Sequence, residues 1–216
     1  MEPANIITTV LFDWDGTLFD SAAASRRAFQ KMFGEFGIAF TEERHDELYA
    51  PDWYGMYRAL DLPREVWPHA DRRWLHHYGE EEPALVEGAA DVLAALAGRG
   101  MGLGIVSSGT RSRILRELER LGLSETFGVL VSNEDVANRK PHPEGLERAM
   151  RALACPPEAC CLVGDTPEDI RMGQAAGVLT VAVPSGYVSA ERLAECGPVV
   201  LLRHIRELPR ALERCR

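Results

Sequence analysis

The stretch Phe12-Asp13-Trp14-Asp15-Gly16-Thr17-Leu18 ends a short apolar and β-branched run, residues 6–12. That run predicts a buried strand, and Gly16 predicts the turn that follows it. Two carboxylates, Asp13 and Asp15, therefore stand one residue apart where a buried strand ends. In an open α/β sheet, ligands bind beyond the carboxyl ends of the strands. Neighbouring carboxylates repel each other, so we expect a divalent cation such as Mg²⁺ between them, unless the pair merely forms a turn.

The composition is that of an ordinary globular protein. Its 216 residues, 46% hydrophobic and 26% charged, are enough for a sizeable core. A net charge of −9 argues against a nucleic-acid or membrane-surface binder, which would need a basic face. The five cysteines are odd in number and lack a Cys-x-x-Cys pair, which disfavours a disulfide framework and a zinc site. We expect a reduced, cytoplasmic protein, monomeric or homodimeric, with no nucleic-acid or membrane partner.

Two patterns alternate along most of the chain. Short apolar runs predict strands, and segments with apolar residues at i, i+3 and i+4 predict helices between them. This alternation indicates an α/β fold: a doubly wound, mostly parallel, Rossmann-like sheet with helices on both faces. The strands predicted after the first are residues 101–106, 129–132, 160–163, 178–183 and 199–202.

Residues 19–84 differ from the rest of the chain because they contain no strand-like run. They read as helices interrupted by three prolines, Pro51, Pro63 and Pro68. We predict that 19–84 form a small all-helical insertion after the first strand. Residues 1–18 and 85–216 then form the α/β core.

Polar residues gather where the predicted strands end. The carboxyl ends of parallel strands lie along one edge of a sheet, so residues that follow different strands come together there. Lys140 stands in the loop after the strand predicted for 129–132. The other polar residues at these strand ends are carboxylates and hydroxyls: Asp13, Asp15, Ser107, Ser108, Asp165 and Asp169.

This combination suits phosphoryl chemistry. Asp13 and Asp165 can hold Mg²⁺, which takes few protein ligands and keeps water or substrate oxygens. Lys140 supplies a point charge for a phosphoryl group, and Ser107 supplies a hydroxyl at the start of a helix, where anions are favoured. One carboxylate of the opening stretch can act as a nucleophile and the other as general acid and base. The residue types leave open whether Asp13 or Asp15 is the nucleophile.

Four segments together resemble the motifs of the haloacid dehalogenase (HAD) superfamily. They are Phe12 to Leu18, Ser107 after its strand, Lys140-Pro141, and Gly164-Asp165 followed by Asp169. The helical insertion resembles the cap domain of the phosphoglycolate phosphatase and β-phosphoglucomutase branch. The resemblance implies a Mg²⁺-dependent phosphoric monoester hydrolase. Its substrate would be a small phosphorylated metabolite, similar to phosphoglycolate or a sugar phosphate.

The resemblance also implies roles for the carboxylates. Asp13 would be the nucleophile that forms an aspartyl phosphate. Asp15 would protonate the leaving oxygen, then activate the hydrolytic water, and would give its backbone carbonyl to Mg²⁺. Asp165 would ligate the metal, and Asp169 would support the metal site directly or through another ligand.

The remaining matched residues would meet the phosphoryl group. Ser107 would hydrogen-bond it, with Ser108 beside it at the same strand end. Lys140 would balance the charge of the phosphoryl group and of the nucleophile. Gly16 and Thr17 would let the backbone approach the phosphoryl group.

Within the family, two residues narrow the chemistry. Asp15 separates this chain from the metal-free dehalogenases of the family, which lack an aspartate at that position. Thr17 favours a phosphatase, because phosphomutases of this type usually carry valine or isoleucine at the position of Thr17. The alternatives are a phosphomutase, a phosphonate-type hydrolase, or a non-catalytic binding or regulatory member of the fold. Substrate choice would come from the insertion, where the candidates are Arg44, His45, Trp53, Tyr54, Arg58 and Trp67.

Overall fold

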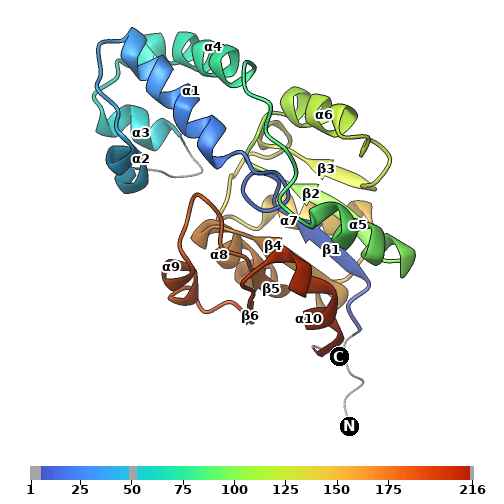
Figure 1. Cartoon of the computed structure of the whole chain (residues 1–216). Coiled ribbons are helices and arrows are strands. Elements are labelled where there is room, and N and C mark those ends of the chain that lie inside the picture. Colours follow the sequence, from blue (N-terminus) through green and yellow to red (C-terminus); the bar gives the residue numbers. More distant parts are fainter. Residues whose placement is uncertain (1–5, 49–52, 215–216) are drawn as a thin grey trace. The chain divides into compact units, whose positions relative to one another are not determined.

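The computed structural model describes residues 6–48 and 53–214. The chain forms two compact units (Figure 1). One consists of Met1–Phe19 together with Leu85–Arg216, and the other consists of Asp20–Ala84. We call them the core unit and the cap unit and describe each by itself.

The core unit is built on a six-stranded sheet with the order β3-β2-β1-β4-β5-β6 (Figure 1). All neighbouring strands run parallel, as the sequence predicts. The strands are β1 (Thr9–Phe12), β2 (Gly102–Val106), β3 (Val129–Val131), β4 (Cys160–Gly164), β5 (Leu179–Ala182) and β6 (Val200–Leu201). Because β1 lies between β2 and β4, the residues that follow β1 meet residues that arrive from both sides.

Helices cover both faces of this sheet (Figure 1). They are α5 (Ala89–Gly98), α6 (Arg111–Arg120), α7 (Glu144–Ala152), α8 (Pro167–Ala176), α9 (Ala190–Ala194) and α10 (Leu208–Arg214). Helix α7 packs against α8, and α5 packs against α10. Single turns of 3₁₀ helix join them at Asn133–Asp135, Pro157–Ala159 and Ile205–Glu207. The five-residue α9 is too short for a periodic pattern and is not among the predicted elements.

Apolar side chains of alternate strand positions fill the space under α7 and α8. Leu11 and Leu162, from the two central strands, pack there with Leu146, Met150 and Met172. Burying such side chains contributes roughly 1.5–3 kcal/mol each. This cluster therefore fixes the two helices against the sheet and fixes the strand ends relative to each other.

The cap unit is all-helical in its described part. It comprises α1 (Ala22–Glu35), α2 (Glu42–Leu48), α3 (Tyr54–Ala59), a 3₁₀ turn at Arg64–Val66, and α4 (Trp67–Tyr78). Its core is aromatic, with Phe29, Phe33 and Tyr57 buried together. The prediction that Pro68 interrupts a helix was wrong, because Pro68 lies in the first turn of α4, where a missing N–H costs nothing. Pro51 lies outside the described residues.

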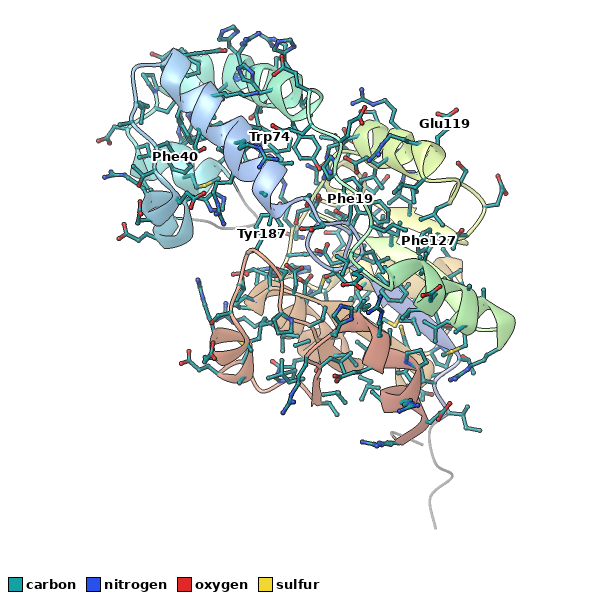
Figure 2. The ribbon with its side chains drawn as sticks, viewed as in Figure 1. Phe19, Phe40, Trp74, Glu119, Phe127 and Tyr187 are labelled. Atoms are coloured by element: carbon teal, nitrogen blue, oxygen red, sulfur yellow. The ribbon has the colours of Figure 1, made fainter. Side chains whose placement is uncertain are left out.

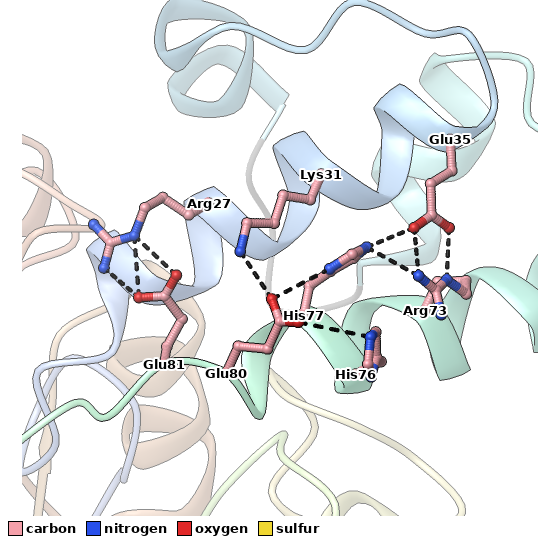
Figure 3. A network of polar contacts seen from close by, with 8 residues as sticks. All are labelled: Arg27, Lys31, Glu35, Arg73, His76, His77, Glu80 and Glu81. Carbon is pink, nitrogen blue, oxygen red and sulfur yellow. Dashed lines mark hydrogen bonds and ion pairs between the residues drawn. The ribbon is translucent and has the colours of Figure 1, made fainter.

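Ion pairs connect α1 to α4 and to the residues that follow it (Figure 3). Glu35 binds Arg73 through two hydrogen bonds of 2.6 Å, and His77 Nε2 lies 2.6 Å from the same carboxylate. These contacts, those of Arg73 above all, lower the pKa of Glu35 to about 2. Lys31 and Arg27 pair with the two glutamates that follow α4, Glu80 and Glu81. Exposed pairs of this kind contribute little singly, and here several of them form a network along the two helices.

No helix in the described part of the chain is both long and apolar enough to cross a membrane.

Candidate active site

The turn after β1 places the first carboxylate. The Asp13 backbone N–H donates to the Val163 carbonyl at 2.9 Å, so the residue still pairs with β4. Gly16 then takes φ +84°, a left-handed conformation that favours glycine. A Cβ on Gly16 would also overlap the Asp165 carboxylate and lie 2.8 Å from the Tyr187 ring. The glycine therefore allows this turn to press against the end of β4.

Three buried carboxylates meet at this point. Ligand oxygens of Asp13, Asp165 and Asp169 all lie within 4.8 Å of one another. Asp165 follows β4, and hydrogen bonds from Thr17 Oγ1 (2.9 Å) and Ser185 Oγ (2.5 Å) hold its two oxygens. Loops that follow three different strands thus fix one carboxylate cluster.

Asp169 is fixed by the start of α8. Thr166 is the N-cap of this helix, and its hydroxyl and backbone N–H both donate to Asp169 Oδ2, at 2.6 Å and 3.1 Å. In return, the Asp169 backbone N–H donates to Thr166 Oγ1 at 3.3 Å, which completes a capping box. The other oxygen, Oδ1, lies 2.7 Å from Lys140 Nζ.

Lys140 enters the cluster from the loop before α7. Its Nζ donates to Asp13 Oδ1 at 2.6 Å as well as lying against Asp169, and its side chain is only 6% exposed. Although burial lowers the pKa of Lys140, the adjoining carboxylates raise it above its ordinary value. The amine therefore stays charged and faces Asp13.

One ammonium group does not balance three carboxylates. Burial raises the pKa of Asp13 to about 7, against the opposing effect of Lys140. Burial, together with Asp13 and Asp169, raises the pKa of Asp165 well above its ordinary value. Because the donors are all hard oxygens, the cluster fits Mg²⁺ better than a metal that prefers sulfur or imidazole. A divalent cation here would offset the charge that burial makes costly.

The hydroxyl residues lie beside the lysine. Ser107 is buried, and its Oγ accepts a hydrogen bond of 3.0 Å from the Gly109 N–H, in the turn that leads from β2 into α6. Ser107, Ser108 and Lys140 line one hollow, together with Asn133 and His142. The structure thus brings Ser107, Ser108 and Lys140, three of the six residues predicted to bind phosphate, to one hollow.

The carboxylate of Asp15 lies apart from this cluster. It forms two hydrogen bonds with Arg113, from Nη1 to Oδ1 (3.0 Å) and from Nη2 to Oδ2 (2.5 Å). Trp14, between the two aspartates, is fully buried, stacked on Phe19 and edge-on to Phe127. Figure 2 labels these two phenylalanines in the core unit. The two aspartates of the opening stretch therefore have different cationic partners.

Three side chains that hold the aspartates in place were not predicted from the sequence to do so. Ser185 follows β5, so the strand-end rule that identified Ser107 could also have identified it. The side chain of Thr17, expected only to free the backbone, orients Asp165 instead. Arg113 lies within α6, where a sequence pattern reads it as one more charged helical residue.

The cap residues suggested for substrate selection have mixed surroundings. Trp53 and Tyr54 both donate hydrogen bonds to Asp71, and Tyr54 stacks on Trp67 at 4.8 Å. These three aromatic residues thus help to build the cap core. His45 is buried, Arg58 lies over the Trp67 ring, and Arg44 is exposed.

Comparisons with known proteins point to one family. Residues 10–183 match the family of haloacid dehalogenase-like hydrolases. The pyrophosphatase PpaX of Oceanobacillus iheyensis is 31% identical over 94% of this chain and 95% of its own. CbbY from Rhodobacter sphaeroides, solved in complex with phosphate, is 26% identical, with a TM-score of 0.82 over 94% of this chain and 96% of that chain.

A structure from Haemophilus somnus, described as a predicted phosphoglycolate phosphatase, has a TM-score of 0.82 over 95% of this chain and 97% of that chain. At 19% identity this likeness shows the shared fold. The matched family span covers all but the first residue of the strands from β1 to β5, together with Asp13, Lys140 and Asp165. The resemblance found in the motifs is confirmed, and the chain belongs to the haloacid dehalogenase-like hydrolase family.

Proposed function

We propose that this protein is a Mg²⁺-dependent phosphatase that hydrolyses a small phosphorylated metabolite through an aspartyl phosphate on Asp13. One observation carries the proposal. The Asp13 carboxylate is buried at the end of the central strand, with Lys140 at 2.6 Å and two further carboxylates within reach of a shared cation. A nucleophilic carboxylate needs such surroundings to approach a phosphate dianion.

In the first half-reaction, an Asp13 oxygen attacks phosphorus and the bond from phosphorus to the ester oxygen breaks. Asp15 gives its proton to that leaving oxygen. In the second half-reaction, water attacks the aspartyl phosphate, Asp15 takes a proton from the water, and the bond between phosphorus and the Asp13 oxygen breaks. Asp13 is released as a carboxylate together with inorganic phosphate, so both residues return to their starting states.

Asp13 and Asp165, with the Asp15 carbonyl and support from Asp169, would hold the cation. When bound, Mg²⁺ supplies positive charge that polarises the phosphoryl oxygens and lowers their repulsion toward the nucleophile. Lys140, whose Nζ contacts both Asp13 and Asp169, would offset part of the charge of these carboxylates. Thr17 and Ser185 keep the oxygens of Asp165 in position for this task.

The phosphoryl oxygens would be received by hydroxyl and backbone donors. Ser107, Ser108 and Lys140 line one hollow, and the Gly16-Thr17 turn lies at the end of β1 beside the carboxylate cluster. Donors that are already in place cost no reorganisation when charge develops on the transferring group.

A second candidate substrate is inorganic pyrophosphate, because the relative from Oceanobacillus iheyensis is named a pyrophosphatase. The same steps apply, with phosphate in place of an alcohol as the leaving group. A phosphomutase and a phosphonate-type hydrolase stay as alternatives, and Thr17 argues against the first.

The test is a substrate panel with and without Mg²⁺: pyrophosphate, phosphoglycolate, sugar phosphates and nucleotides, with release of inorganic phosphate as the readout. Asp13→Asn is the matched variant, since it removes the nucleophile while keeping the size of the side chain and one acceptor oxygen. We expect Mg²⁺-dependent release from at least one ester or from pyrophosphate, and none with Asp13→Asn. Acid quenching during turnover should trap labelled phosphate on the wild type alone.

Three results would contradict the proposal. Product that is isomerised sugar phosphate would identify a mutase. Full activity in Asp13→Asn would remove the nucleophile assignment. Absence of phosphate release across the whole panel would favour a binding or regulatory member of the fold.

A further inference from the structure

The carboxylate of Asp15 is held by a chain of three side chains that the reaction scheme above does not use. Arg113 binds both Asp15 oxygens, and its own side chain is only 7% exposed. Arg113 Nη1 also donates to both oxygens of Glu117, at 3.0 Å and 3.1 Å. Glu117 in turn accepts a 2.7 Å hydrogen bond from Trp14 Nε1.

The backbone of this region is shaped to admit the guanidinium. A Cβ on Gly109 would overlap Arg113 Nη2, so any larger residue there would displace the arginine. Arg113 and Glu117 are one helical turn apart on α6, and both face inward. Trp14 is fixed by its ring contacts with Phe19 and Phe127. The guanidinium thus has little freedom to move away from Asp15.

The two hydrogen bonds from Arg113 also limit the movement of the Asp15 carboxylate. A bidentate pair with arginine fixes both the position and the plane of the carboxyl group, which a lysine could not do. The side chain of Asp15 is 22% exposed, so it stays open to solvent on the side that Arg113 does not cover. If a group that transfers a proton is displaced by about 1 Å, the rate of the reaction can fall by on the order of a hundredfold.

We propose that Arg113, anchored by Glu117 and Trp14, is a positioning residue that orients the Asp15 carboxyl for proton transfer to and from the reacting oxygen. This proposal rests on the proposed function, because it takes Asp15 as the acid and base of that reaction. The proton still moves from Asp15 to the leaving oxygen, and later from water to Asp15. Arg113 exchanges no proton: when Asp15 carries one, the Asp15 oxygen without it still accepts a hydrogen bond from the guanidinium, so the carboxyl group keeps its position.

Leaving groups of different basicity separate this role from a structural one. Departure of an alkoxide needs a proton from Asp15, whereas departure of a nitrophenolate does not. The probes are therefore glycerol 3-phosphate and 4-nitrophenyl phosphate, with kcat/KM measured at saturating Mg²⁺. A variant that merely loosens the fold would lower both values together.

Three variants make up the test. Arg113→Lys keeps the charge beside Glu117 but loses the bidentate geometry. Arg113→Met with Glu117→Gln removes both buried charges, which avoids an unpaired glutamate, and still leaves an acceptor for Trp14. Arg116→Met is the control, because Arg116 is an exposed residue of the same helix that bonds only its own helix in the contacts described.

We expect the double variant to lose on the order of a hundredfold in kcat/KM for glycerol 3-phosphate, with KM nearly unchanged, and to stay close to wild type for 4-nitrophenyl phosphate. Arg113→Lys should fall between wild type and the double variant, and Arg116→Met should match wild type. Equal losses on both probes, or no loss on either, would overturn the inference. If the wild type hydrolysed neither probe nor any member of the substrate panel, the proposed function itself would have failed.

Discussion

Replacing Lys140 by methionine should destabilise the metal-free protein and nearly abolish turnover. Methionine is similar in length and apolar, so the change removes the charge and little volume. The buried ammonium lies 2.6 Å from Asp13 and 2.7 Å from Asp169, and the variant leaves both carboxylates without it. Mg²⁺ should then restore stability to a larger extent in the variant than in the wild type.

The size of the effect follows from the burial of the pair. Removing one partner of a buried ion pair costs about 3–5 kcal/mol. For a chain of this size each kcal/mol lowers Tm by about 2–4 °C, so we expect a loss of about 6–20 °C without Mg²⁺. Losing one preorganised donor at a reacting oxygen lowers kcat by roughly a hundred- to a thousandfold.

The sequence offers a matched control, because the chain contains just two lysines. Lys31 pairs with Glu80 at 3.0 Å on the surface of the cap unit, with 45% of its side chain exposed. An exposed pair contributes at most about 1 kcal/mol, so Lys31→Met should shift Tm by no more than a few degrees. The assay is thermal unfolding of wild type and both variants across a Mg²⁺ titration, followed by phosphate release.

Two results would refute this reasoning. If both lysine variants melted together in the absence of Mg²⁺, Lys140 would not be offsetting the carboxylate charge. If Lys140→Met kept the wild-type kcat/KM, the ammonium would have no part in transferring the phosphoryl group.

Two further predictions concern the cation site. Gly16→Ala should weaken Mg²⁺ binding, because the new Cβ would overlap the Asp165 carboxylate. Gly37→Ala is the control: its φ is +71° and the space around it is open, so it should lose stability only through a backbone strain of about 1–2 kcal/mol and leave Mg²⁺ affinity unchanged. Calorimetric titration of both variants with Mg²⁺ would contradict this if their affinities fell equally. Mg²⁺ affinity of the wild type should rise with pH through about 7, because burial raises the pKa of Asp13 from 3.8 to about 7 and its proton must leave before the cation binds. Between those two values the metal-free folded state holds a proton that the unfolded state lacks, so its stability should fall as pH rises, and stability that rose with pH there would contradict the assignment.

The strands and helices of the core unit could be predicted from the sequence because local pattern and burial agree in them. The fully buried β1 and β4 are apolar runs, and the helices carry one apolar face. Details that depend on distant contacts could not be predicted in this way. The position of β1 between β2 and β4 depends on how the helices pack. Pro68 lies in the first turn of α4, next to its first residue, and does not end a helix.

The residues of the candidate site that follow strands could be predicted from the sequence, and those that reach it from elsewhere could not. Asp13, Asp165 and Lys140 each stand at a strand end or in the loop after one, so parallel topology alone brings them together. The second oxygen partner of Asp165, Ser185, obeys the same rule but stands in a Pro-Ser-Gly turn that reads as an ordinary loop. Arg113 follows no such rule, because its side chain reaches Asp15 from the interior of a helix.

The structure breaks the symmetry that the sequence left between Asp13 and Asp15. Asp13 faces an ammonium group and two other carboxylates, so it belongs to the site where a cation and a phosphate would meet. Asp15 faces a guanidinium that takes both of its oxygens and is itself fixed by Glu117. The Asp15 carboxylate is therefore not part of the acidic cluster that could hold a cation. Under the proposed function it would keep a constant position while Asp13 forms and loses a bond to phosphorus, so the separate cationic partners support the proposal that Asp13 attacks and Asp15 transfers the proton.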